Sequence, residues 1–156
     1  MRKYDLLGYR KRKQFTKYDS ITYHTYDNAL AQDFSAVSPN QKWVTDISYI
    51  FTKQGVFYLS VIKGLYDNSI VSYRYGDKQS HLLVTSTVTD ALKKEKGTEK
   101  LMLHSDQGFQ YTSTVYCNLL VANDIQPSMS RRGNPYEGLP LRVQCLCGEL
   151  LQHAEE

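Results

Sequence analysis

Apolar residues gather in short runs over the first half of the chain, and their spacing predicts β-strands. Residues 43–51, 56–62 and 70–75 are rich in aromatic and β-branched side chains, and the third run alternates apolar with polar positions. Gly55 ends one turn signal between these runs, and Asp67 begins another. Because such short turns cannot carry a crossover, we expect the three strands to form an antiparallel meander.

The spacing of the apolar residues then changes to that of a helix. Val84 and Val88 recur at helical period, and Ser80 can cap the first turn of that helix. The charged run at residues 93–96 leads to Gly97, which can end the helix. The sequence therefore predicts that an amphipathic helix follows the meander.

A second helix and two short strands follow. Residues 101–104 are predicted to form one short buried strand and residues 125–128 a possible further one, and between them Thr112 or Ser113 can cap a helix. The whole order is three strands, helix, strand, helix, strand. It predicts an α/β fold with a mixed sheet whose βα units cover its faces, which is the order of a ribonuclease-H-like fold.

The composition fits one globular domain with a basic arm in front of it. The 156 residues are 41% hydrophobic and 22% charged, which allows a buried core. Seven of the 19 basic residues lie within the first seventeen positions, so residues 1–40 are interpreted as a basic arm or linker. Such an arm either contacts phosphate or remains solvated. Residues 41–136 carry the predicted core, and residues 137–156 form a tail of different composition.

Cysteine content and hydropathy argue against secreted and membrane proteins. Three cysteines match no zinc or disulfide framework, and they predict reduced thiols in a cytosolic chain. No apolar run approaches the roughly 18 residues of a membrane span, and the basic start lacks the apolar segment of a secretory signal. We therefore expect no membrane partner.

Two aspartates sixty positions apart are the candidate chemistry of the chain. Asp46 lies within the first predicted strand, and Asp106 ends the fourth. A carboxylate in a buried strand is costly unless it is paired, and two of them indicate a shared hard cation such as Mg²⁺. The alternative is that each aspartate simply forms a turn or caps a helix.

Three further side chains are candidates near these carboxylates. His104 lies two residues before Asp106, on the same face of the strand, where it could contact substrate, orient a ligand or be a structural histidine. Arg131 and Arg132 are suited to phosphate, although they also fit a solvated loop.

The surroundings of these residues carry a resemblance to a known family. The segments at residues 40–47 (NQKWVTDI), 104–111 (HSDQGFQY) and 130–136 (SRRGNPY) resemble those of bacterial insertion-sequence transposases. These enzymes are relatives of retroviral integrases, with a ribonuclease-H-like core and an Asp-Asp-Glu triad. The resemblance runs from about residue 1 to Tyr136.

The resemblance implies a function for the candidate residues. Asp46 and Asp106 would be the first two ligands of Mg²⁺ or Mn²⁺, in a reaction where water and then a DNA 3′-hydroxyl attack a phosphodiester. The implied process is DNA transposition and integration in the bacterial cytoplasm, at the nucleoid. The implied partners are the element's ends, target DNA, and an intact transposase or a second copy of the chain. The residues expected to contact DNA are Lys11, Arg12, Lys13, His104, Arg131 and Arg132.

Two departures from the family pattern predict an inactive copy. The family's N-terminal helix-turn-helix region is missing, so we expect a truncated chain. Counting the family's interval to the third carboxylate forward from Asp106 reaches Arg142, whose charge would repel a metal ion. Glu137 and Glu149 are not at the expected spacing. A frameshift after Tyr136 explains the tail best.

Two alternatives to an inactive transposase core remain open. One is a non-catalytic DNA-binding remnant that keeps the basic arm. The other is an active nuclease of the same fold that recruits Glu137 or Glu149 as its third carboxylate.

Overall fold

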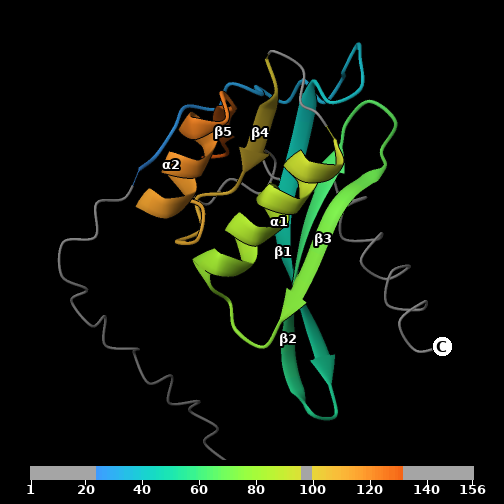
Figure 1. Ribbon diagram of the computed structural model, residues 1–156, viewed down its shortest axis with the longest axis vertical. Helices are drawn as coiled ribbons and strands as arrows, with labels where there is room; N and C mark the ends of the chain where they lie inside the picture. The colour runs from blue at the N-terminus through green and yellow to red at the C-terminus, as the bar shows by residue number, and fades with distance from the viewer. Residues whose placement is uncertain (1–23, 96–99, 132–156) are drawn as a thin grey trace, which may run out of the picture.

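The computed structural model describes residues 24–95 and 100–131, and these form an α/β structure (Figure 1). Lys11, Arg12, Lys13 and the predicted tail therefore lie outside the described residues. The elements in chain order are β1 (Lys42–Thr52), β2 (Gly55–Gly64), β3 (Ile70–Gly76), α1 (His81–Lys94), β4 (Met102–Ser105), α2 (Thr114–Ala122) and β5 (Gln126–Met129).

The five strands form one mixed sheet in the order β3-β2-β1-β4-β5. β1 pairs antiparallel with β2, and β2 pairs antiparallel with β3, which gives the predicted meander. β4 joins the other edge of β1 in parallel, and β5 adds to β4 in parallel. The chain enters β4 through α1 and β5 through α2, because parallel strands need a long crossover connection. The predicted mixed sheet is confirmed, and β1 is its centre.

One face of the sheet is covered by both helices, and this is where the main core lies (Figure 1). Trp43, Ile62 and Leu103 from the three central strands are fully buried against Val84 of α1 and Leu120 of α2. Each of these residues belongs to an apolar run or to a helical spacing, such as that of Val84 and Val88, from which its element is predicted.

Serine side chains cap both helices. Ser80 Oγ accepts a hydrogen bond from the backbone N–H of Leu83, and Ser113 Oγ accepts one from that of Tyr116. Each bond satisfies an amide that the first helical turn leaves without a partner. Ser80 is thus the predicted cap, and Ser113 is the cap of the second helix. Within the described residues, no helix is both long and apolar enough to cross a membrane.

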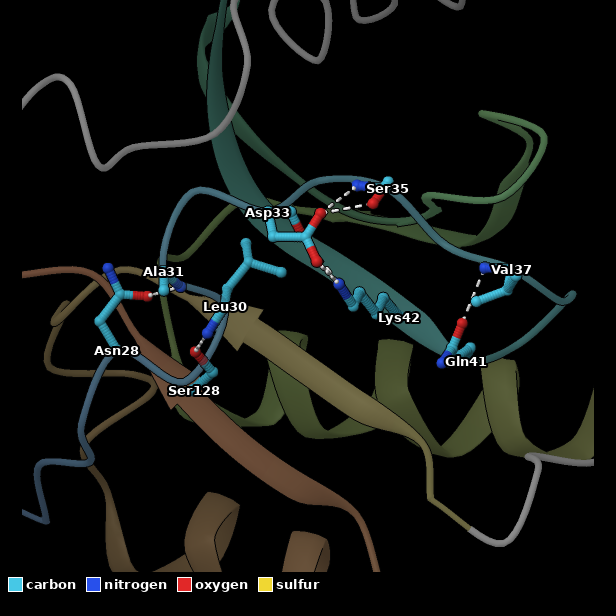
Figure 2. A network of polar contacts seen from close by, with 9 residues as sticks. All are labelled: Asn28, Leu30, Ala31, Asp33, Ser35, Val37, Gln41, Lys42 and Ser128. Carbon is cyan, nitrogen blue, oxygen red and sulfur yellow. Dashed lines mark hydrogen bonds and ion pairs between the residues drawn. The ribbon is translucent and has the colours of Figure 1, made fainter.

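The opposite face of the sheet is partly covered by residues 24–36, here called the strap. Leu30 of the strap is buried in a cluster with Val44 and Leu65. The backbone N–H of Leu30 donates to Ser128 Oγ at 3.0 Å, and Lys42 Nζ lies 2.8 Å from a carboxylate oxygen of Asp33. Figure 2 shows both contacts. The strap belongs to the predicted basic arm in sequence, yet it packs on the sheet. The predicted boundaries at residues 40 and 136 stay predictions.

Candidate active site

The pairing of β1 with β4 brings Asp46 and Asp106 to the same place. Every register pair of these two strands joins residues sixty positions apart, and the last of them is Val44 with His104. The same offset of sixty residues relates Asp46, which lies within β1, to Asp106, the first residue after β4. The predicted neighbourhood of the two aspartates follows from a parallel register of two short apolar strands.

Both aspartates line one hollow of about 270 Å³ at the end of β4. Such a volume can hold a cation together with several water molecules. The other walls come from β1, from the residue before the cap of α1 and from the loop after Asp106. These lining residues are Ile47, Tyr49, Gln79, Gly108, Phe109, Gln110 and Tyr111.

Burial and the charge of Asp106 both act on the carboxyl group of Asp46. Burial raises the pKa of Asp46 above its ordinary value, the backbone N–H of Ile47 lowers that pKa in part, and the negative charge of Asp106 raises it further. Burial also raises the pKa of Tyr111 well above its ordinary value, and the same two carboxylates add to that rise. The hollow is therefore a place where negative charge is disfavoured unless a cation shares it.

The loop after Asp106 fixes the orientation of its carboxylate. Oδ1 of Asp106 accepts a hydrogen bond from the backbone N–H of Gly108 at 2.9 Å. A Cβ at Gly108 would lie 2.9 Å from that same oxygen and 2.9 Å from Oε1 of Gln110. Cβ atoms essentially never approach other atoms so closely, so a side chain at position 108 would force the carboxylate of Asp106 and the amide of Gln110 to move.

Behind the hollow lies a pair of buried tyrosines that the sequence did not single out. The rings of Tyr111 and Tyr116 meet edge to face with centroids 5.4 Å apart, and Tyr111 OH lies 3.4 Å from Thr45 Oγ1. Thr45 precedes Asp46 in the chain, and Tyr111 ends the motif that begins at His104. The positions of Thr45 and Tyr111 inside two recognisable motifs could have pointed to a role in the site. The contact between them depends on the fold.

On the β1 side, the wall of the hollow is held by Tyr49 and Gln79, which the sequence also did not single out. Tyr49 OH donates to Oε1 of Gln79 at 3.2 Å, and the Tyr49 ring packs edge to face on Tyr58. Gln79 belongs to the connection between β3 and α1, so only the folded sheet brings it beside β1.

The remaining predicted residues lie apart from the hollow. His104 is only 1% exposed, and its Nδ1 lies 2.9 Å from Ser128 Oγ. A side chain so buried has no surface for DNA, so we leave His104 out of the proposed DNA contacts. Arg131 is exposed after β5, and Arg132 lies outside the described residues, so their predicted contacts with DNA stay predictions.

The donors that the structure describes fit a magnesium or manganese ion with a partly open coordination shell. Across residues 24–95 and 100–131, no group of three or more histidines, cysteines or carboxylates is placed to hold a metal. Two carboxylates do share the hollow, and Mg²⁺ is commonly held by one or two carboxylates, with waters and substrate phosphates completing its shell. Glu137, Arg142 and Glu149 lie outside the described residues, so the position of a third carboxylate stays a prediction.

The chain is similar to a known domain family and to proteins of bacterial mobile elements. Residues 36–135 match the integrase core domain family. A transposase-like protein of Haemophilus influenzae is 40% identical over 129 residues, which cover 83% of this chain and 59% of that protein. The putative transposase InsK of insertion sequence element IS150 from Escherichia coli is 36% identical over 140 residues, which cover 90% of this chain and 49% of that protein. The chain thus spans about half the length of these relatives.

Solved structures of low sequence identity share the fold. A chain of the simian T-cell lymphotropic virus intasome superposes with a TM-score of 0.65 at 17% identity, covering 81% of this chain and 42% of that one. The HTLV-2 integrase catalytic core domain, determined in complex with magnesium, gives a TM-score of 0.62 at 18% identity, covering 76% and 73%. The predicted ribonuclease-H-like fold is confirmed. This chain belongs to the integrase core domain family, and it is similar to transposases of bacterial insertion sequences over about half of their length.

Proposed function

We propose that this chain is the catalytic-core portion of a DNA transposase, built for metal-dependent strand transfer at phosphodiesters. The proposed metal is Mg²⁺ or Mn²⁺, and the proposed ligands are Asp46 and Asp106. The partners are the ends of a mobile element, target DNA, and another copy of the chain or an intact transposase. Its proposed place is the bacterial cytoplasm, at the nucleoid.

One observation carries this proposal. Asp46 and Asp106 come from different strands, yet both line the same hollow, and the charge of Asp106 raises the pKa of Asp46. Folding such a like-charged pair together costs free energy in the absence of a cation. A bound divalent cation supplies charge stabilisation at the attacking and leaving oxygens of a phosphodiester. The two relatives named above, a transposase-like protein and a putative transposase of an insertion sequence element, support the same proposal.

The chain's own residues would bind the cation and hold its ligands in a fixed orientation. The two carboxylates offer hard oxygen ligands, and the backbone N–H of Gly108 holds one oxygen of Asp106 in place. The buried ring of Tyr111 closes the floor of the hollow and keeps bulk water from that side. Such preorganised positioning is how protein groups contribute most to phosphoryl transfer.

We further propose that this copy has lost the transfer activity. The proposal rests on the sequence, because the family's interval from Asp106 reaches Arg142 where a third carboxylate is expected. A non-catalytic DNA-binding remnant is the second candidate, and it is favoured by the basic residues of the N-terminal arm. In both cases a frameshift after Tyr136 is the proposed origin of the tail. Reading the coding DNA in the other frames tests this origin, and it fails if none encodes a helix that carries a glutamate.

A nicking assay with a metal-binding control tests the function. The full chain would be incubated with supercoiled DNA and Mn²⁺, and Mn²⁺ affinity would be measured for the wild type, Asp106→Asn and Asp124→Asn. Asp124 is an exposed turn residue with φ 52°, a conformation that asparagine adopts readily, so it serves as the matched control. We expect Mn²⁺ binding that only Asp106→Asn weakens.

The outcomes separate the candidates. Nicking that Asp106→Asn abolishes would show an active enzyme and overturn the proposed loss of activity. A salt-sensitive gel shift without nicking or Mn²⁺ binding would leave the DNA-binding remnant. Mn²⁺ affinity equal in the wild type and Asp106→Asn would overturn the proposed metal site.

A further inference from the structure

A buried chain of hydrogen bonds connects the strap to the strand that precedes Asp106. Ser128 Oγ accepts a hydrogen bond from the backbone N–H of Leu30 at 3.0 Å, and the same oxygen lies 2.9 Å from His104 Nδ1. All three residues are at most 2% exposed. Whichever ring nitrogen of His104 carries the hydrogen, the serine hydroxyl can complete the contact, because it both donates and accepts.

The position of this contact in the sheet makes it relevant to Asp106. His104 and Ser128 are register partners across the parallel pair of β4 and β5, and β4 has only four residues. The backbone N–H of Ser130 donates to the carbonyl of Ser105 at 3.0 Å, which ends the pairing one residue before Asp106. A strand this short has few backbone hydrogen bonds, so a buried side-chain contact contributes much to holding its end.

The strap also reaches the loop that follows Asp106. The backbone N–H of His24 donates to the carbonyl of Thr112 at 3.1 Å, and the N–H of Thr112 donates to the carbonyl of Gly108 at 3.1 Å. Gly108 in turn holds the carboxylate of Asp106. The strap is therefore attached on both sides of Asp106, before it through Ser128 and after it through Thr112.

From these attachments of the strap before and after Asp106, we propose that His104 is a positioning residue. It acts through Ser128 and the strap to hold Asp106 in the orientation that binds metal. The proposal rests on the proposed function, since it takes Asp106 as a metal ligand. His104 itself touches neither metal nor DNA. The contact to Ser128 keeps the end of β4 in register, and the strap amide of Leu30 completes the hydrogen bonding of the same hydroxyl. Groups that hydrogen-bond directly to a metal ligand commonly change metal affinity by about 10- to 100-fold when they are removed, and His104 acts one contact further away, so we expect the lower end of that range.

Replacement of two serines with alanine is the first arm of the test. Ser128→Ala removes the shared hydroxyl, and Ser60→Ala is the matched control, because Ser60 is equally buried in the sheet and its Oγ has no hydrogen-bond partner in the part of the chain that is described. Mn²⁺ affinity of the full chain would be measured by calorimetry, and hydrogen exchange would be measured at the Leu30 amide. We expect Ser128→Ala to weaken Mn²⁺ binding by about tenfold or more and to speed exchange at Leu30, and Ser60→Ala to change neither.

Two substitutions of His104 form the second arm, which stays informative if Ser128→Ala does not fold. The side-chain amide of His104→Asn can occupy the place of Nδ1 and keep the contact to Ser128, whereas that of His104→Gln reaches the place of Nε2 and loses it. We expect Mn²⁺ affinity close to the wild type for His104→Asn and a loss of about tenfold for His104→Gln. A merely structural histidine would lose stability in both variants without this difference in metal affinity.

The results distinguish the failure of each proposal. If the wild type binds Mn²⁺ and Ser128→Ala binds it equally well while exchange at Leu30 rises, His104 is not a positioning residue and the metal site stands. Equal Mn²⁺ affinities of His104→Asn and His104→Gln would likewise show that His104 is not a positioning residue. If the wild type binds no Mn²⁺, the proposed function itself is overturned.

Discussion

The backbone nitrogen of Gly108 and the carboxylate oxygen Oδ1 of Asp106 lie 2.9 Å apart, and a Cβ on that glycine would lie equally close to the oxygen. Gly108→Ala must therefore push the carboxylate away or break the loop's hydrogen bond. We expect Mn²⁺ affinity to fall by about tenfold, with a cooperative thermal transition retained. Calorimetric titration with Mn²⁺ measures the effect.

The matched control for that substitution is Gly76→Ala. A Cβ at Gly76 would meet no atom closer than 3.7 Å, which is ordinary van der Waals contact. Gly76→Ala should leave Mn²⁺ affinity unchanged. Equal affinities of the two alanine variants would mean that the approach of Gly108 does not orient Asp106.

Asp46→Asn should separate stability from metal binding. Burial and the charge of Asp106 raise the pKa of Asp46, so the ionised pair opposes folding when no cation is present. In a chelator, we expect the melting temperature of Asp46→Asn to equal or exceed that of the wild type. With Mn²⁺ at about 100 times its dissociation constant, the wild type should gain about 2.7 kcal/mol, a rise of roughly 5–10 °C. A similar rise in the variant would contradict a ligand role for Asp46.

The ion pair of Asp33 with Lys42 should stabilise the strap in a pH-dependent way (Figure 2). Hydrogen bonds from Lys42 and Ser35 lower the pKa of Asp33 from 3.8 to about 2. Because the folded-state pKa is depressed, this contribution to stability is complete above pH 3.8 and is lost as pH falls toward 2. The contribution is small, because Asp33 is 62% exposed to solvent.

The measurement for the ion pair is the difference in melting temperature between the wild type and Asp33→Asn. We expect the wild type to melt slightly higher near neutral pH and the two curves to converge in acid. A difference that stays constant down to the lowest pH would show that the depressed pKa of Asp33 has no consequence for folding.

The core between the sheet and α2 should respond to truncation at Leu120. This side chain is fully buried, so Leu120→Ala should cost about 2–5 kcal/mol of unfolding free energy. Val121→Ala is the control in the same helix, because Val121 is 68% exposed, and its cost should stay within about 0.5 kcal/mol. Urea denaturation of both variants measures the two costs. Comparable losses would mean that α2 does not pack as described.

The sheet and both helices could be predicted because apolar residues gather in short runs in the strands and recur at helical spacing in the helices. The strand predicted at residues 43–51 is β1, and the helix predicted after Ser80 is α1. Asp46 and Asp106 could be paired as well, because the parallel register of β1 and β4 carries through to them. In these places local pattern and tertiary packing specify the same structure.

The strap and the contact of His104 with Ser128 could not be predicted, for one physical reason. The strap has no period, and it turns through Ala31 and Gln32, whose φ angles are 47° and 64°, where neither residue type is favoured. Its shape is set by tertiary contacts, such as that of Leu30 with Ser128, 98 residues away. The sequence shows only that His104 lies two residues before Asp106. The contact that surrounds its ring comes from Ser128 on the neighbouring strand.

The distance between Leu30 and Ser128 along the chain also sets an order of events during synthesis. A ribosome delivers the meander of β1, β2 and β3 early, and its contacts are local enough to form as it emerges. The strap leaves first of all the described residues, but the strand that anchors it is made last. The strap can pack on β1 early, but its hydrogen bond to Ser128 must wait until β5 is complete. We expect this contact to be the closing step of folding.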